Sequence, residues 1–557
     1  MKQLLKYKHL LFLILALVVI NLLASQFHHR FDLTGDNRYT LSPAAKEIIG
    51  QVEAPLFIDV FMKGSFPPEF RRLQNETRQF LEEVVSYNPN IKFNFIDPLA
   101  EGDDANAIAE EFYSLGMTPA RLSVMENGKA SEMLIFPWAL ANFNDETVKI
   151  PLLKNKLGAT DEERVNNSVQ QLEYSFADAI SRLVKERKKK IAVMRGNGEL
   201  PDANLADFIQ TIQQYYLVAP FTLDSTSVNP QKTLKDLKEY DLIIEAKPTQ
   251  AYSEEEKFLL DQYLMQGGKA LWLIDHVAIE TDSLFNARGS AFAIPRDLNL
   301  GDMFFSYGIR INPVLVNDIY SAPLILATGR GNETKFTPYP WFYSPLTSSP
   351  SSHPIINNLE AVKFEWANPI ELLKNDLTKT VLLTSSPRTK LEGAPREISL
   401  EILGSKPDIS TYTAGEQPLA VLLEGSFKSA YKNRIKPFEI EKPLDSSEAT
   451  QMIVISDGDV IKNQVQKGEP LELGFERYTG TTYGNKEFLL NAVNYLLDDS
   501  GLIDIRSKEI NIAFLNAEKA IAEREKWQLI NLAFPVLILL LAAFGINYFR
   551  KKRYQKN

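Results

Sequence analysis

Three short groups of polar residues stand where chemistry could occur. Arg195–Gly198, an Arg-Gly-Asn-Gly run, follows an expected strand and precedes an expected helix, which is the position of phosphate-cradling loops. Asp457–Asp459 ends another expected strand with two carboxylates, the donor type that hard divalent cations prefer. Asp275 and His276 end a third strand, at the edge where the active sites of open α/β sheets gather.

None of these groups completes a motif. Pro201 stands where a phosphate loop has its third glycine, and no Walker lysine follows. Asp457–Asp459 lacks EF-hand spacing and a third acidic ligand, so a turn is the simpler interpretation. The sequence has no cysteine, no Gly-x-Ser-x-Gly and no His-Glu-x-x-His. We therefore expect no catalytic residue, no cofactor and no metal, while a hydrolase with a hidden acidic or histidine site stays open.

The length and charge of the chain limit its class. A chain of 557 residues is too long for one hydrophobic core, so several domains are expected. The net charge is −10 and basic residues gather at the ends, which argues against nucleic-acid binding. The absence of cysteine excludes disulfides and thiolate metal sites.

Two apolar segments predict membrane-spanning helices, at residues 10–27 and 529–549. Lysines precede the first segment and a basic cluster follows the second, so the positive-inside bias places both termini in the cytoplasm. A cleaved signal peptide is the rival interpretation of the first segment, but no well-placed small-x-small pair follows it. The chain between the two segments is then expected outside the cytoplasm, in the periplasm of a bacterium.

The first half of this exported region has the pattern strand, helix, strand, over 56–62, 69–86 and 91–96. Ser42 is placed to cap an earlier helix that begins at Pro43. The order of elements resembles the opening of a thioredoxin-like domain. Ser65–Pro68 stands where a redox enzyme of that kind has Cys-x-x-Cys, so redox chemistry is excluded.

The second half alternates strands with helices and therefore predicts an open parallel sheet. Ser253 and Glu256 have capping-box spacing, and Gly267-Gly268 is expected to end the same helix. The expected strands are 191–194, 241–245, 270–274, 314–317, 381–384, 419–424 and 452–456, and the expected helices are 203–215, 253–265 and 485–497. The predicted organisation is a cytoplasmic N-terminus (1–9), transmembrane helix (10–27), thioredoxin-like domain (28–184), linker (185–190), α/β domain (191–510), helical stalk (511–528), transmembrane helix (529–549) and cytoplasmic tail (550–557).

Two sets of residues are candidates for a partner interface. The first set lies in and beside the two membrane anchors: Asn21 in the first, and Trp527, Asn531 and Pro535 in or beside the second. Polar or kinking residues in a membrane helix usually face protein, and residues near its ends lie at the membrane boundary. The aromatic residues of the loop 337–354 are either a partner surface or a lid packed on its own domain, and they are Tyr339, Trp341, Phe342 and Tyr343.

Four sequence runs carry a resemblance across essentially the whole chain: Asp32–Thr34 with Arg38–Ser42, Gly267–Lys269, Tyr483–Phe488 and Lys526–Asn531. In these runs and in its architecture the chain resembles the gliding-motility-associated ABC-transporter accessory proteins of Bacteroidota, the GldG type. Residues 253–275 are also similar to a domain of an intraflagellar-transport protein with a glutamine amidotransferase-like fold. Such an amidotransferase needs a cysteine nucleophile, so the domain is expected to be catalytically empty.

The resemblance implies a non-ATPase subunit that joins a polytopic ABC permease and a cytoplasmic ATPase in a bacterial inner membrane, in a complex required for gliding motility. We expect the large periplasmic region to couple permease motion to periplasmic partners. The alternative is a tethered receptor for a periplasmic ligand or substrate of the same transporter, with a small molecule in a cleft.

Overall fold

The computed structural model divides the chain into two compact units, Met1–Lys508 and Glu509–Asn557. In the first predicted membrane segment, residues 10–27, the structure describes only residues 12–18 and 21, which are helical. The prediction of a membrane-spanning helix there therefore lies largely outside the described residues. The run 32–34 lies wholly outside them, and so does most of the predicted stalk. The described residues are 12–18, 21, 40–99, 105–126, 129–154, 158–186, 188–329, 334–347, 353–404, 406–507 and 522–554.

The N-terminal part of the first unit contains a four-stranded sheet in the order β2-β1-β5-β6. β1 (Leu56–Val60) and β2 (Ile91–Phe95) are parallel, because α3 (Pro68–Tyr87) carries the chain back between them. β5 (Trp138–Phe143) and β6 (Glu146–Pro151) extend the sheet as an antiparallel hairpin beside β1. The predicted strand-helix-strand pattern is thus confirmed.

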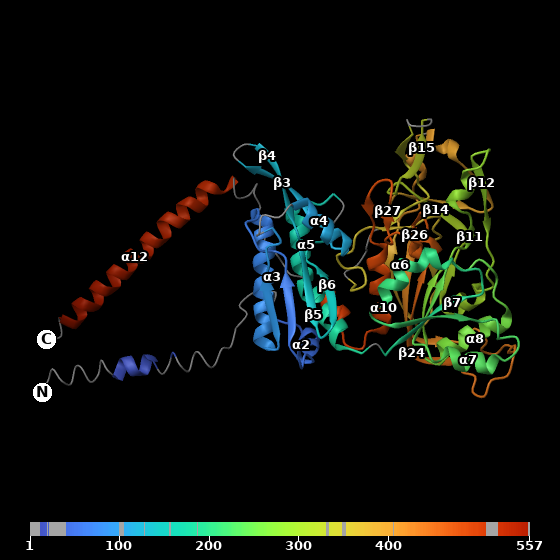
Figure 1. The fold of residues 1–557 in the computed structure, drawn as a ribbon, viewed down its shortest axis with the longest axis horizontal. Coiled ribbons are helices and arrows are strands. Elements are labelled where there is room, and N and C mark those ends of the chain that lie inside the picture. The colour runs from blue at the N-terminus through green and yellow to red at the C-terminus, as the bar shows by residue number, and fades with distance from the viewer. Residues whose placement is uncertain are drawn as a thin grey trace. The chain divides into compact units, whose positions relative to one another are not determined.

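Helices cover this sheet and supply much of its core (Figure 1). α2 (Pro43–Gly50) begins as predicted, since the Ser42 side chain accepts a hydrogen bond from the Ala45 backbone N–H. α5 (Asp161–Val184) begins with a capping box and buries residues along most of its length. The remaining elements are α4 (Ala105–Ser114) and the hairpin of β3 (Ala120–Glu126) and β4 (Lys129–Ile135).

The C-terminal part of the unit is built on a seven-stranded sheet in the order β20-β23-β24-β10-β9-β7-β8. The five strands from β24 to β8 are parallel, and β23 runs antiparallel to them. β20 is antiparallel to β23, so it has the same direction as the five. The sheet is therefore mixed rather than wholly parallel, because no α-helix lies in the described connections between β20, β23 and β24. The strands are β7 (Lys190–Arg195), β8 (Leu217–Thr222), β9 (Leu242–Ala246), β10 (Lys269–Leu273), β20 (Thr378–Thr384), β23 (Pro418–Lys428) and β24 (Ser446–Ile455).

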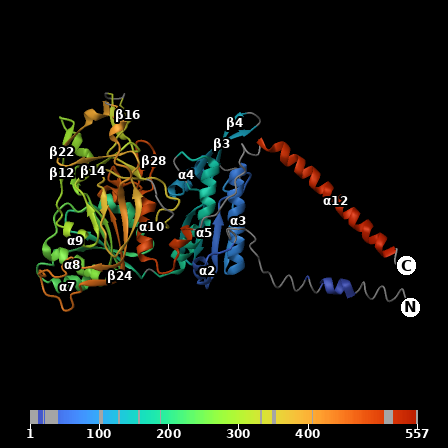
Figure 2. The same ribbon diagram turned by 180° about the vertical axis from the view of Figure 1, so that it is seen from behind.

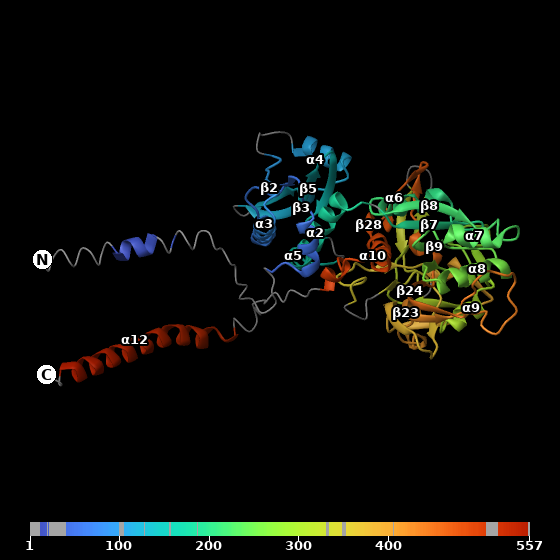
Figure 3. The same ribbon diagram turned by 90° about the horizontal axis from the view of Figure 1, so that it is seen from below.

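Helices pack on both faces of this sheet. Figure 3 shows α7 (Pro230–Leu237), α8 (Glu254–Met265) and α9 (Gly301–Ser306) on one side and α6 (Asp202–Ile212) and α10 (Asn485–Leu497) on the other. Each side has its own buried apolar cluster. The predicted capping box of α8 is confirmed, since Ser253 accepts from the Glu256 N–H and the Glu256 carboxylate accepts from the Ser253 N–H.

Between β10 and β24 the chain makes a group of short strands, and further short strands follow β24. Figure 2 shows β12, β14, β16 and β22 gathered at one end of this part, away from α7 and α8. β14, which covers the expected strand 314–317, pairs with β21 and does not join the large sheet. The strands are β11 (Val277–Ala278), β12 (Ser290–Pro295), β13 (Ile309–Ile311), β14 (Val314–Asp318), β15 (Leu324–Thr328), β16 (Lys335–Tyr339), β17 (Leu346–Thr347), β18 (Val362–Lys363), β19 (Ile370–Leu372), β21 (Thr389–Gly393), β22 (Arg396–Ser399), β25 (Val465–Gln466), β26 (Glu469–Pro470), β27 (Phe475–Glu476) and β28 (Thr481–Thr482).

One ion cluster links residues from the two parts of this unit. Glu487 of α10 binds Lys154, which follows β6, and Arg506, whose nitrogen lies 2.8 Å from the carboxylate. Burial disfavours the charged carboxylate, but Lys154 and Arg506 outweigh it and lower the pKa of Glu487 to about 2. The Glu487 carboxylate therefore stays charged through the neutral pH range, whereas burial lowers the pKa of Lys154 to about 8, so this partner begins to lose its proton just above neutral pH.

The second unit contains α12 (Arg524–Tyr554). Its residues Arg524–Lys552 form the one helix in the described part of the chain that is long and apolar enough to cross a membrane. An 18-residue stretch of this helix has a mean hydropathy of 2.6, and none of that stretch is buried. Trp527, Asn531 and Pro535 all lie within this helix. The helix suggests that the protein is anchored in a membrane.

Candidate functional site

Charged residues from three neighbouring strands meet at the carboxyl edge of the large sheet. Lys247 follows β9, Asp275 follows β10, and Asp457 and Asp459 follow β24. The three strands are parallel neighbours, so their carboxyl ends lie at one edge. The structure thus brings together two groups that the sequence offered separately, and it adds Lys247. We call these four residues the charge cluster.

Lys247 is the centre of the charge cluster. Its ammonium lies 2.6 Å from Asp459, 2.8 Å from Glu280 and 3.4 Å from Asp275, and its side chain is only 2% exposed. The Lys247 backbone has a φ of +59°, a left-handed conformation that non-glycine residues seldom adopt. A fixed backbone and three carboxylates therefore hold this side chain.

Gly458 is required beside Lys247. A Cβ atom added to Gly458 would lie 2.3 Å from the Lys247 Cγ and 3.0 Å from its Cα. The Gly458 N–H donates to Asp275 at 2.6 Å, so the glycine also fixes the second carboxylate of the charge cluster. The middle residue of Asp457–Asp459 is thus a close-packing position.

Burial acts to raise the pKa of each of the three aspartates, and their neighbouring charges make the three pKa values differ. Burial raises the pKa of Asp275 to about 6, although Lys247 opposes this shift. Burial and the neighbouring Asp459 raise the pKa of Asp457 well above its usual range. Burial also acts on Asp459, but Lys247 and Lys462 outweigh it and lower the pKa of Asp459. Asp459 is therefore the principal anionic partner of Lys247.

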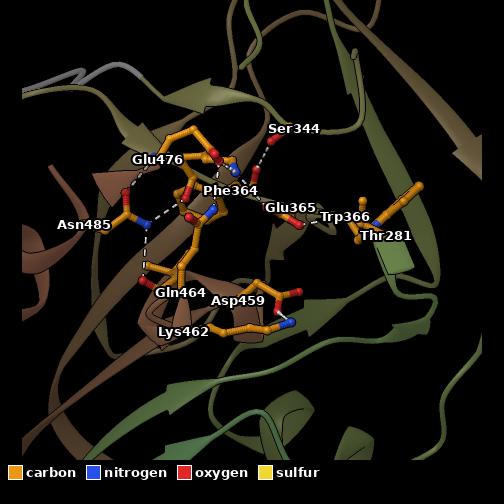
Figure 4. A network of polar contacts seen from close by, with 12 residues as sticks. Thr281, Ser344, Phe364, Glu365, Trp366, Asp459, Lys462, Gln464, Glu476 and Asn485 are labelled. Atoms are coloured by element: carbon orange, nitrogen blue, oxygen red, sulfur yellow. Dashed lines mark hydrogen bonds and ion pairs between the residues drawn. The ribbon is translucent and has the colours of Figure 1, made fainter. Parts of the chain in front are cut away.

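A second set of polar residues continues outward from the charge cluster (Figure 4). Lys462 lies 3.1 Å from Asp459, and Lys363 lies 2.7 Å from Glu365. Glu365 also accepts a hydrogen bond from the Thr281 hydroxyl at 3.1 Å. These side chains, unlike Lys247, are partly exposed and can be reached from the surface.

A cavity of about 760 Å³ lies against these outer residues. Its polar lining includes Glu280, Lys363, Asp459 and Lys462, and its apolar lining includes residues 323–327 of the β15 region. The volume is within the range of small-molecule and peptide pockets. Because the carboxylates of the charge cluster are held by cations and backbone N–H groups, the arrangement is suited to binding through charge and shape.

Comparisons with known proteins place the chain in a family. The family described as an ABC-type uncharacterized transport system matches residues 188–492, more than half of the chain. The chain belongs to this family. The matched range contains the whole charge cluster and the cavity.

Other matches extend the comparison without adding a function. A domain of unknown function matches residues 35–142. An uncharacterized protein of Borreliella burgdorferi is 20% identical over 94% of this chain and 93% of its own length. The N-terminal domain of mmIFT52 covers 56% of this chain and 99% of its own length at 12% identity, with a TM-score of 0.30.

In this transport-system protein the loop Arg195–Gly198 does not offer a free anion site. The Glu199 carboxylate accepts from the Asn197 N–H at 3.0 Å, which is the place a phosphate oxygen would take. The Asn197 carbonyl accepts from the N–H groups of Thr249 and Gln250. The loop therefore serves to hold the turn after β9, and with it the segment that carries Lys247.

His276 is fixed mainly through its backbone, whose N–H donates to Asn368 at 2.7 Å, and burial lowers the pKa of its imidazole. Within the described ranges, no group of three or more His, Cys, Asp or Glu side chains has the geometry to hold a metal ion.

The aromatic loop divides between core and surface. Trp341 and Tyr343 are 3% and 4% exposed and pack with Trp366 in a buried cluster. Tyr339 and Phe342 remain half-buried. For Trp341 and Tyr343 the geometry fits a segment packed on its own domain, whereas a partner surface stays a prediction for Tyr339 and Phe342.

A buried carboxyl that the sequence analysis missed lies inside β9. Glu245 is fully buried and accepts a hydrogen bond from the Tyr252 hydroxyl at 2.9 Å. Burial, and then the neighbouring Glu199, raise the pKa of Glu245 from 4.5 to about 8. The folded protein thus holds a proton here at neutral pH that the unfolded chain releases.

This proton makes stability depend on pH. The contribution of Glu245 is fully present below pH 4.5 and is lost as the pH rises through about 8. Between pH 5 and 7 we expect wild type to lose about 2 kcal/mol of unfolding free energy relative to Glu245→Gln. Urea unfolding at a series of pH values measures this difference. A constant difference between the two proteins across that range would contradict the assignment.

Proposed function

We propose that this protein is the membrane-anchored, extracytoplasmic, non-ATPase subunit of a GldAFG-like ABC transporter complex that serves gliding motility. The observation that carries the proposal is the family match over residues 188–492 in a chain that also carries the exposed apolar helix 524–552. In this proposal both ends of the chain anchor in the bacterial inner membrane, and the domains between them are periplasmic. The partners are a polytopic permease and a cytoplasmic ATPase, and the protein itself is not an enzyme.

The domain types fit this role. The order β2-β1-β5-β6, with β1 and β2 parallel and the last two strands antiparallel, supports a thioredoxin-like N-terminal domain. The five parallel strands with helices on both faces support an amidotransferase-like α/β domain without its cysteine. The Glu487 ion cluster would let force on one part reach the other.

Affinity purification from the native membrane tests the permease contact. Full-length protein should retain a permease and an ATPase in mild detergent, and a variant lacking residues 529–557 should lose both, because the apolar helix would form the contact. A matched control replaces residues 529–549 by a leucine-rich span of equal length, which keeps the anchor and changes the contacting side chains. Full-length protein that never retains either subunit would rule out the proposal.

A second function, a tethered receptor, is favoured by one observation, the cavity of about 760 Å³ beside the charge cluster. Its lining combines charged and apolar side chains, as ligand sites do. Native mass spectrometry of the purified chain would distinguish the two, since a receptor should carry a bound ligand when no permease is present.

A further inference from the structure

The hairpin of β15 and β16 has one edge that is open for pairing. The two strands pair only with each other among the described residues. β16 carries Pro338, which has no N–H, so its outer edge is a poor template for another strand. β15 carries no proline and keeps all its backbone donors.

Pro338 also fixes which way the β15 backbone points. Ile325 stands opposite Pro338 in the antiparallel register. A pair that contains proline cannot exchange both backbone hydrogen bonds, so this is a non-hydrogen-bonded pair, and the Ile325 N–H and C=O point away from β16. By alternation, the same groups of Ala327 also point outward.

The cavity runs along this open edge. Pro323 and the four consecutive β15 residues 324–327 line it. Successive side chains of a strand point to opposite faces, so a cavity on one face would touch every second residue. The cavity instead touches four strand residues in a row, as a cavity beside a strand edge does, and the Ile325 and Ala327 backbone groups are directed to that edge.

The other lining residues indicate what could occupy the cavity. Phe285, Phe336 and Tyr478 line it and are 53%, 52% and 41% exposed, with the last two rings stacked at 4.2 Å. Five carboxylates but only three basic side chains line the cavity. Asp282, exposed at its wall, has no ion-pair partner in the described part of the chain.

We propose that this cavity binds an extended, lysine- or arginine-bearing segment of a protein partner, which adds to β15 as a third strand. Backbone groups of the segment pair with Ile325 and Ala327, apolar side chains contact the exposed aromatic rings, and a basic side chain pairs with Asp282. The site goes beyond the proposed function, because it does not depend on the contact of the apolar helix with a permease.

Synthetic peptides test the proposal on detergent-purified full-length protein. The probe is a fluorescein-labelled peptide of about seven residues that alternates valine and lysine, long enough to cover β15. Fluorescence anisotropy should show saturable binding, and N-methylation of alternate backbone amides should weaken it by about tenfold or more because those donors are lost. A valine-glutamate peptide should not bind. Equal affinity for the methylated and unmethylated lysine peptides would overturn the proposal.

Two variants locate the binding. Ile325→Pro removes an outward N–H that the hairpin does not use, so the fold should persist while the affinity for the lysine peptide falls about tenfold. Asp282→Lys should weaken binding about fivefold or more, whereas Glu441→Lys, an equal charge change at an exposed residue outside the lining, should not. Unchanged affinity in both site variants, with an unchanged melting temperature, would place the peptide elsewhere and overturn the assignment.

Discussion

Lys247→Met should lower the unfolding free energy by about 3 kcal/mol, because it leaves buried carboxylates without their central cation. Asp459 lies 2.6 Å from this ammonium and is only 6% exposed, so water cannot replace the lysine. Lys462 and Arg296 remain beside Asp459 and Asp275, which keeps the cost at the lower end of the usual range. Urea unfolding at neutral pH measures the change.

Lys428→Met is the matched control for this variant. Lys428 binds Asp376 at the same distance, 2.6 Å, but the two side chains are 57% and 81% exposed. Water screens such a pair, so its loss should leave the unfolding free energy nearly unchanged. Equal effects of the two substitutions would show that burial does not govern the Lys247 contacts.

Gly458→Ala should also be strongly destabilising, by about 2 to 3 kcal/mol, since the added methyl group overlaps Lys247. The overlap includes the Lys247 Cα, at 3.0 Å, so a side-chain rotation alone does not relieve it. Either the β24 end or the Lys247 turn must move, and both movements lengthen the ion pairs of the charge cluster. The same unfolding assay measures the effect.

Gly393→Ala is the matched control for Gly458→Ala. It makes the same chemical change in β21, where no atom lies within 4 Å of the added Cβ. It should therefore alter stability little. The double variant Gly458→Ala with Lys247→Met tests the cause. If its loss of unfolding free energy equals the sum of the two single losses, the added methyl group does not act through Lys247, and steric overlap with that lysine is not the cause.

Local signals in the sequence predicted local structure well. The caps at Ser42 and Ser253 are formed by residues within three positions of each other, so one short stretch of sequence contains all that is needed. β8 was missed because Pro220 lies inside it, and proline argues against a central strand. The structure shows why it is tolerated, since β8 is the edge strand of the sheet.

The charge cluster could be predicted only in fragments. Asp275 and Asp457 were each weak candidates because their partners lie far away along the chain. Lys247 belongs to none of the three polar groups, and nothing near it in sequence indicated burial. The available signal was that three expected strands, ending near 245, 274 and 456, were each followed by a charged residue. A parallel sheet places such residues at one edge.

The order of the strands has a consequence for how the chain is made. β10 pairs with β24, and the Gly458 N–H that binds Asp275 lies 183 residues further along the chain. During synthesis, Lys247 and Asp275 therefore emerge long before Asp459, and the sheet stays unfinished until β24 arrives. Such distant pairing makes folding slow and leaves an open strand exposed in the meantime. A nascent chain stalled before β24 should be a substrate for chaperones rather than a folded intermediate.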